Sequence, residues 1–413
     1  MLRLRVIPPE RRVEIDLEGR PIAAFEGEPL AASLCAAGQG ILSRSLKYHR
    51  PRGPFCFSAS CAQCLMRVDG VPNVFSCQVP ARAGLRVERQ NAFPSAGLDV
   101  LEAVDWIFPR RLDHHHLMAG VPVADAVTAR VTRRMAGLGR LPDRVATPAD
   151  AAGSLRTEVA IVGGGVAGFA AARELRRWGV DFALFDRDPF SALPEDLPEV
   201  RAGAAAVGLY DEAQGRFLAV AVRDVRGKTC LLRTFARRFL LATGGHATLP
   251  PFANNDRPGI YSGRAAGVLL ERHGLLVGGR VVLAEAGDSA DPLEALLRAR
   301  GALVTRVHPG ALGEAYGRRG VRGVYLRDGR TLTCDALVIN LPPSPSFELA
   351  AQGGARVQPG AEPGTFSLVH DADGRTAASD LFVAGALAGA LTHQAAEASG
   401  ITAARALGAE LRR

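Results

Sequence analysis

The sequence has little lysine, no long apolar runs and no clusters of basic residues, and each of these shortages argues against a class of function. Lysine occurs only at Lys47 and Lys228, so the formal net charge of +8 comes from arginines scattered along the chain. Without a basic run to follow a phosphate backbone, binding to nucleic acid is not expected. A basic face for an acidic partner subunit stays open.

Apolar stretches are also too short for a membrane protein. None approaches the ~20 uncharged residues that cross a bilayer, and residues 1–8 have no apolar core like that of a secretory signal peptide. We therefore expect a cytoplasmic protein whose membrane contact, through a quinone acceptor, is at most peripheral. A chain of 413 residues with 47% hydrophobic and 22% charged residues predicts two or three globular domains.

Cysteines are few, and most of them are clustered. The chain has seven, an odd number that argues against a disulfide framework. Four follow the pattern C-x4-C-x2-C-x12-C, at Cys56, Cys61, Cys64 and Cys77. This spacing is typical of plant-type ferredoxins, in which four thiolates hold a [2Fe–2S] cluster. Zinc is the alternative metal, although zinc modules typically use two C-x2-C pairs and this segment has one.

The loop between the first two of these cysteines reads Phe57-Ser58-Ala59-Ser60 and contains no glycine. Ferredoxin loops are usually rich in glycine, because their backbone N–H groups must turn toward the sulfides. Positive φ is costly for other residues, so we expect a cluster of lower stability or shifted potential. Cys35, Cys230 and Cys334 have no partner in spacing and are predicted to be core residues.

The segment around the cysteines predicts a small β-grasp domain. Residues 13–22 read as strand, glycine turn and strand, residues 28–37 as a short helix, and residues 65–68 as a strand after the loop.

A connector is predicted to follow, with one helix near residues 123–135. It contains His114-His115-His116, but adjacent side chains on a loop point in different directions. A structural or partner-contact role is therefore favoured over a metal site.

A dinucleotide-binding motif begins after the connector. Gly163-Gly164-Gly165-Val166-Ala167-Gly168 matches G-x-G-x-x-G, follows the apolar strand 158–162 and opens a helix over residues 169–178. Gly163 would allow the tight turn, and Gly168 would allow the helix to pack closely on the strand. Gly165 would let the pyrophosphate approach the helix N-terminus, beside Val166 and Ala167. The alternative is a structural βαβ unit without a ligand.

Further motifs make FAD the predicted ligand of this turn. Asp186, followed by Arg187, ends the next strand and would accept hydrogen bonds from the adenosine ribose. Residues 240–245 (LLATGG) resemble the second flavin motif, with Thr243 and Gly244 at the cofactor. Residues 376–386 resemble the C-terminal flavin motif, with Gly385 and Ala386 near the ribityl chain and pyrophosphate. Most such flavoproteins have Asp where this chain has Ala386; backbone N–H groups near Gly385 could take its place.

A second βαβ unit starts at residues 280–284, but its turn does not suit a nucleotide. Residues 285–292 read EAGDSADP, so side chains fill the space that a pyrophosphate needs and three carboxylates would repel it. We expect no nicotinamide cofactor. The predicted fold class is α/β with an α+β N-terminal domain: a β-grasp [2Fe–2S] ferredoxin-like domain, then a two-dinucleotide-binding, disulfide-reductase-like Rossmann flavoprotein fold. The predicted domains are 1–95 (ferredoxin-like), 96–156 (connector), 157–270 (first FAD-binding part), 271–335 (degenerate NAD-type insert) and 336–413 (second FAD-binding part).

Three segments carry a family resemblance: residues 45–53 (SLKYHRPRG), 90–95 (QNAFPS) and 252–260 (FANNDRPGI). With Gly385-Ala386 in place of Gly-Asp, they resemble the α subunits of heteromeric sarcosine oxidases and of hydroxyproline and proline dehydrogenases, opine oxidases and hydrogen cyanide synthase. The resemblance covers nearly the whole chain. It implies that a partner flavoprotein subunit of the D-amino-acid-oxidase-like type oxidises the C–N bond, with or without a small additional subunit.

The resemblance implies an oxidoreductase subunit that relays electrons through FAD and [2Fe–2S] to a quinone or another carrier. Because a folate-binding extension and a C-terminal cysteine-rich segment are absent, the hydroxyproline, proline or opine type fits better than sarcosine chemistry. The alternatives are a self-sufficient FAD-dependent NAD(P)H reductase and a non-catalytic scaffold subunit.

No catalytic acid, base or nucleophile is predicted. Two roles are open for four residues of the first segment, Lys47, His49, Arg50 and Arg52. They would hold an anionic group or the flavin edge, or they would pin the ferredoxin-like domain to the flavin domain. The second role is favoured.

Overall fold

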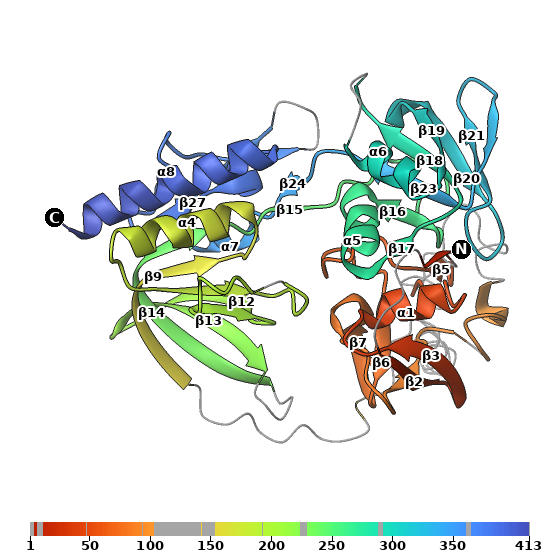
Figure 1. The fold of residues 1–413 in the computed structure, drawn as a ribbon, viewed down its shortest axis with the longest axis horizontal. Helices are drawn as coiled ribbons and strands as arrows, with labels where there is room; N and C mark the ends of the chain where they lie inside the picture. Colours follow the sequence, from red (N-terminus) through yellow and green to blue (C-terminus); the bar gives the residue numbers. More distant parts are fainter. Residues whose placement is uncertain are drawn as a thin grey trace, which may run out of the picture. The chain divides into compact units, whose positions relative to one another are not determined.

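The computed structural model describes residues 4–5, 11–46, 48–92, 94–102, 142, 153–191, 193–223, 229–287, 292–360 and 365–412. It divides into two compact units (Figure 1). Unit 1 comprises Met1–Val145 and Thr248–Leu341, and unit 2 comprises Ala146–Ala247 and Pro342–Arg413. Among the described residues, no helix is both long and apolar enough to cross a membrane.

Unit 1 begins with a five-stranded β-grasp sheet in the order β3-β2-β8-β6-β7. Its strands are β2 (Arg12–Leu17), β3 (Arg20–Phe25), β6 (Leu65–Val68), β7 (Val71–Phe75) and β8 (Arg86–Glu88). Alternation along β2 buries Val13, Ile15 and Leu17 against helix α1 (Leu30–Ala36). The pair β2–β8 is parallel and the other pairs are antiparallel, as a β-grasp requires. A short ribbon of β4 (Ser43–Arg44) and β5 (Pro51–Arg52) precedes the cysteine loop.

The second part of unit 1 is a four-stranded parallel sheet in the order β16-β23-β18-β19. Its elements are β16 (Ile260–Ser262), α5 (Gly263–His273), β18 (Arg280–Glu285), α6 (Pro292–Ala299), β19 (Leu303–Val307) and β23 (Ala336–Asn340). A small antiparallel sheet joins β20 (Leu312–Tyr316), β21 (Gly323–Leu326) and β22 (Thr331–Thr333). One hydrophobic core contains Leu30 and Leu34 of α1 together with Tyr261 and Leu269, so both parts of unit 1 fold as one body. Strand β1 (Leu4–Arg5) also pairs with β17 (Leu275–Leu276).

Unit 2 is built on a seven-stranded sheet in the order β11-β10-β9-β14-β13-β12, with β27 beside β14. Its strands are β9 (Gly153–Val162), β10 (Phe182–Asp186), β11 (Val200–Ala202), β12 (Ala205–Glu212), β13 (Gly215–Arg223), β14 (Thr229–Leu241) and β27 (Leu381–Val383). Helices α4 (Val166–Arg177) and α8 (His393–Leu411) lie side by side on one face (Figure 1). Smaller elements are β15 (Gly245–His246), β24 (Ser344–Pro345), α7 (Glu348–Gln352), β25 (Val357–Pro359) and β26 (Phe366–Leu368).

The boundaries inside the chain differ from those predicted. Residues 248–270, placed above in the first FAD-binding part, belong to unit 1, because β16 pairs in parallel with β23. Residues 336–341, placed above in the second FAD-binding part, belong to unit 1 for the same reason. The predicted helix at residues 123–135, His114-His115-His116 and Lys47 lie outside the described residues.

Candidate cofactor sites

The four predicted cluster ligands meet at one end of the β-grasp sheet. Cys56 follows β5, Cys61 and Cys64 precede β6, and Cys77 lies in the short helix η1 (Ser76–Gln78) after β7. Cys61 is half-buried and the other three are buried. The loop thus carries three of the predicted ligands and the short helix after β7 carries the fourth, where we expected a strand.

The thiols form two hydrogen-bonded pairs, Cys56 with Cys61 and Cys64 with Cys77. The bond from Cys61 lowers the pKa of Cys56 to about 4, and the bond from Cys77 lowers the pKa of Cys64. One thiolate in each pair is therefore favoured. Among the described residues no three or more His, Cys, Asp or Glu side chains are grouped to hold a single metal ion. Two pairs suit the two irons of a [2Fe–2S] cluster.

Backbone N–H groups of the loop turn toward the sulfur atoms. Ser58 and Ser60 each donate to Cys56 Sγ at 3.4 Å, and the N–H of Ala59 lowers the pKa of Cys77 against the larger raising effects of its pairing and burial. Donors of this kind stabilise thiolates and tune cluster potentials.

The turned backbone places three non-glycine residues in the left-handed region. Phe57 has φ of 49°, and Ala59 and Ala62 each have φ of 53°. The predicted positive φ at non-glycine loop residues is therefore confirmed, and its expected effect on cluster stability stays a prediction.

The glycine turn of unit 2 has the shape of a phosphate cradle. A Cβ on Gly163, where φ is 108°, would lie 2.2 Å from the Ala242 carbonyl oxygen, and a Cβ on Gly168 would lie 1.9 Å from that of Gly163. By contrast, no described atom lies within 4 Å of a Cβ built on Gly165. Gly165 caps α4 without a side-chain hydrogen bond among the described residues. The first N–H groups of the helix thus face open space, which fits a pyrophosphate.

Asp186, the residue predicted to bind the adenosine ribose, lies beside this turn. The Asp186 carboxylate accepts hydrogen bonds from the N–H groups of Gly164 (3.1 Å) and Asp188 (3.0 Å) and from the Ser191 hydroxyl (3.0 Å). A cavity of about 530 Å³ opens here, lined by Gly163, Asp186, Arg187 and Thr243 together with His246 and Glu348. Sequence reasoning missed His246 of β15 and Glu348 at the start of α7, whose side chains lie 2.8 Å apart.

The remaining predicted flavin residues lie in the same unit. Gly244 has φ of 70°, and the Thr243 hydroxyl donates to the Ser346 carbonyl at 3.0 Å. Gly385 also has φ of 70° and opens the short helix η4 (Gly385–Ala388), which contains Ala386. The Gly385 N–H donates to the Ser399 hydroxyl at 3.1 Å, so this group does not point to a ligand in place of the missing Asp.

The described residues beside the second nucleotide-like turn, in unit 1, contact one another. At the carboxyl ends of β18 and β23, Asn340 donates to Glu285 at 3.0 Å. Arg306 lies 3.4 Å from the same carboxylate and donates to the Gly287 carbonyl at 2.7 Å. Glu285, one of the three carboxylates expected to repel a pyrophosphate, is thus paired; Asp288 and Asp291 lie outside the described residues.

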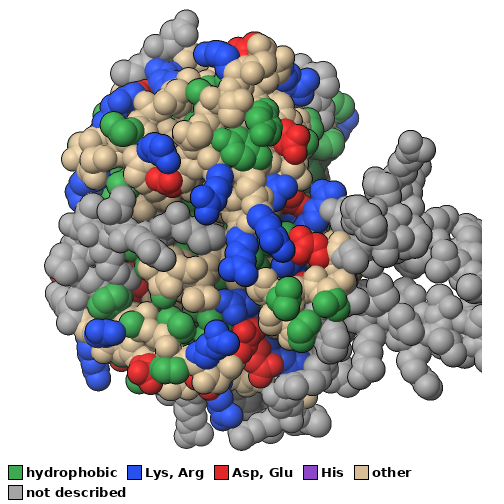
Figure 2. Space-filling view, turned by 90° about the vertical axis from the view of Figure 1, so that its right-hand side faces the viewer, with side chains coloured by type: hydrophobic (Ala, Val, Ile, Leu, Met, Phe, Trp, Pro, Cys, Tyr) green, Lys and Arg blue, Asp and Glu red, His purple; other side chains and the backbone are tan. Residues whose placement is uncertain are grey.

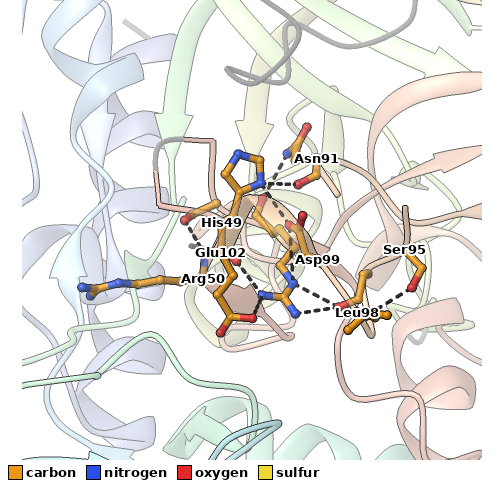
Figure 3. Close-up of polar contacts among 10 residues, drawn as sticks. His49, Arg50, Asn91, Ser95, Leu98, Asp99 and Glu102 are labelled. Atoms are coloured by element: carbon orange, nitrogen blue, oxygen red, sulfur yellow. Dashed lines mark hydrogen bonds and ion pairs between the residues drawn. The ribbon is translucent and has the colours of Figure 1, made fainter. Parts of the chain in front are cut away.

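The segment at residues 45–53 is held by a buried polar network (Figure 3). His49, at φ of 52°, places Nδ1 3.0 Å from the Asp99 carboxylate and 3.1 Å from the Asn91 carbonyl. Because both partners are acceptors, Nδ1 carries the hydrogen. Arg44 donates to the carbonyls of His49 (2.7 Å) and Ala96 (2.9 and 3.0 Å). His49 therefore has a structural place within unit 1, and Arg44 and Asp99 carried no recognisable signal in the sequence.

Arg52 and Arg50 also contact unit 1 itself. Arg52 lies 2.7 Å from Asp256, which precedes β16. The Arg50 guanidinium lies 5.5 Å from the centre of the Tyr48 ring. Arg52 thus joins the β-grasp part to the segment before β16, which we placed in the first FAD-binding part and which belongs to unit 1.

A β-grasp domain with two thiol pairs and a Rossmann domain with an open glycine turn define an iron–sulfur flavoprotein. A family described as a 2Fe-2S iron-sulfur cluster binding domain matches residues 10–92, and a family described as an FAD binding domain matches residues 156–204. The chain belongs to the family of sarcosine oxidase α subunits and the hydrogen cyanide synthase subunit HcnA, and its cofactors are FAD and a [2Fe–2S] cluster.

Individual relatives cover different parts of the chain. Sarcosine oxidase subunit alpha of Rhizobium meliloti is 27% identical over 329 residues, which are 70% of this chain and 33% of that protein. HcnA of Pseudomonas aeruginosa is 38% identical over 77 residues, 19% of this chain and 73% of that protein. The chain spans about a third of the length of the sarcosine oxidase subunits it matches. The crystal structure of L-proline dehydrogenase from P. horikoshii shares the fold, with a TM-score of 0.73 and 21% identity over 100% of this chain and 76% of that one.

Proposed function

We propose that the chain is the electron-transferring flavo-iron–sulfur subunit of an amine or amino-acid dehydrogenase complex. It would accept electrons from a substrate-oxidising flavoprotein subunit and pass them to an acceptor such as a quinone. The observation that carries the proposal is the presence on one chain of two paired-thiol sites and an open phosphate cradle. The relatives named as subunits of sarcosine oxidase and hydrogen cyanide synthase support a partner subunit.

The proposed roles follow from the placement of the residues. Cys56, Cys61, Cys64 and Cys77 would hold the cluster. Gly163, Gly165, Val166, Ala167 and Gly168 would cradle the FAD pyrophosphate, Asp186 and Arg187 would bind the adenosine, and Thr243, Gly244, Gly385 and Ala386 would line the rest of the cofactor. When bound, FAD and the cluster supply the two-electron and one-electron redox chemistry, and the protein positions and tunes them.

The partner and substrate belong to the same proposal. A D-amino-acid-oxidase-like flavoprotein subunit would oxidise proline, hydroxyproline or an opine, with or without a small third subunit. Basic side chains are widespread on the face drawn in Figure 2, with acidic ones between them, which is compatible with docking of an acidic subunit.

A self-sufficient NAD(P)H reductase is disfavoured by the second nucleotide-like turn. Nucleotides bind at the carboxyl ends of parallel strands, and there the Glu285–Asn340–Arg306 contacts occupy the edge of the second sheet. A nicotinamide dinucleotide would have to displace them.

An anaerobic reductive titration tests this function. We expect dithionite to reduce both FAD and the cluster, while excess NADH reduces neither. The isolated chain should oxidise none of the candidate amino acids with an artificial acceptor, whereas the chain co-expressed with its flavoprotein partner should. Rapid bleaching by NADH would contradict the relay and favour the reductase.

A further inference from the structure

The loop between the first two cysteines folds back on its own first ligand. The backbone N–H groups of Ser58 and Ser60 donate to Cys56 Sγ, each at 3.4 Å. Phe57 and Ala59 have positive φ, whereas the two serines do not. Backbone that alternates in this way forms a nest, in which successive N–H groups converge on an anion. The loop therefore directs two N–H dipoles at one sulfur atom.

The side chains of the same four residues fix this backbone in two ways. Phe57 belongs to the hydrophobic core of unit 1, and Ala59 packs against that core. The half-buried serines that alternate with them contact each other: the Ser58 and Ser60 hydroxyls lie 3.1 Å apart and share a hydrogen bond across Ala59. The loop is thus anchored by apolar contacts at residues 57 and 59 and closed by a hydroxyl pair at residues 58 and 60.

The hydroxyl pair matters because this loop contains no glycine. Positive φ is unfavourable for Phe57 and Ala59, so surrounding contacts must offset the strain of the conformation that aims the N–H groups. The hydrogen bond between the two hydroxyls joins the residues on both sides of Ala59, and these are the same two residues that donate to Cys56. Breaking this bond would let both N–H groups move away from the sulfur.

We propose that Ser58 and Ser60 are a positioning pair for the iron–sulfur site: their hydrogen-bonded hydroxyls hold two backbone N–H groups on Cys56 Sγ and raise the reduction potential of the cluster. One-electron reduction adds a negative charge to the cluster, and hydrogen bonds to its sulfurs stabilise that charge. The role deepens the proposed function and rests on its cofactor assignment. The serine pair would thus compensate for the missing glycines of the loop.

The test compares the midpoint potential of the cluster in wild-type and Ser58→Ala holoprotein, followed by electron paramagnetic resonance. Ser58→Ala removes the hydroxyl and keeps the N–H donor, so a shift reports on the placement of the loop. The potential should become more negative, and the equilibrium constant for one-electron reduction should fall roughly two- to tenfold, the range of one neutral hydrogen bond. An unchanged potential would overturn the role, even with faster loss of the cluster in urea, because a pair that only stiffens the loop would change that rate alone.

Ser60 provides the second variant and the conservative one. Ser60→Ala should shift the potential in the same direction, whereas Ser60→Thr, which retains a hydroxyl, should stay near the wild type. Because both alanine variants break the same hydrogen bond, the double variant should shift no further than the larger single shift. Additive shifts, or equal potentials in Ser60→Ala and Ser60→Thr, would overturn the proposal. The resonance comes only from molecules that hold a cluster, so these comparisons stay decisive after partial loss of iron.

Ser95→Ala is the matched control. Ser95 also lies in unit 1, and its hydroxyl also spans a short loop, where it accepts from the Leu98 N–H at 3.2 Å. It should leave the potential unchanged, and a shift equal to that of Ser58→Ala would contradict a specific effect. Iron and sulfide are assayed on the wild type first. Their absence would overturn the cofactor assignment itself, a result distinct from a variant that keeps its iron and its potential.

Discussion

Replacing Ala62 by glycine should stabilise the cluster loop. Ala62 is exposed and has φ of 53°, so its methyl group is strained and packs little. The left-handed conformation costs a non-glycine residue roughly 1–2 kcal/mol. Glycine avoids this cost but loses about 0.5–1 kcal/mol more conformational entropy on folding than alanine does. The net gain is about 0.5–1 kcal/mol, which corresponds to a two- to fivefold slower loss of the cluster if the loop relaxes during loss.

The assay follows the decay of visible cluster absorption in anaerobic urea. Ala59→Gly is an informative comparison, because Ala59 has the same φ but packs against the core. The lost methyl contact, worth up to ~0.8 kcal/mol, should cancel most of the gain. Ala23→Gly, in the exposed part of strand β3, should give no slowing. Equal or faster cluster loss in Ala62→Gly would refute the strain argument.

Three further outcomes are expected. Cys77→Ser should lose iron but keep FAD, which binds in the other unit, while Cys230→Ser keeps both cofactors; loss of FAD from Cys77→Ser would contradict this. Gly165→Ala should fold normally but bind FAD roughly tenfold more weakly. Gly168→Ala should lower the stability of unit 2 by about 1–3 kcal/mol, because its Cβ would lie 1.9 Å from the Gly163 carbonyl oxygen. FAD titration measures the first effect and urea unfolding the second. Removing iron with a chelator should lower only the melting transition of unit 1, and calorimetry that shows both transitions moving together would argue against two units.

Local patterns predicted the local structure well. The strand at residues 65–68 has the predicted bounds, because the residues that define it and its turn are adjacent in the sequence. The four cysteines expected to bind the cluster lie at one end of the β-grasp sheet, and their role as ligands stays a prediction.

Contacts between distant segments were not predictable. Because β16 pairs with β23, residues 248–270 belong to unit 1 and not to the FAD-binding part. The local sequence around β16 does not indicate a strand partner so far along the chain. His49 was expected at a domain junction, yet its neighbours Arg44 and Asp99 bury it within unit 1.

The most direct test of the account is the cofactor content of the anaerobically purified chain. Iron, acid-labile sulfide, zinc and flavin are assayed together with the visible spectrum before and after dithionite. The account predicts about two irons and two sulfides per FAD, with flavin bands over broad cluster absorption that bleach on reduction. Zinc without sulfide, or iron without flavin, would contradict it.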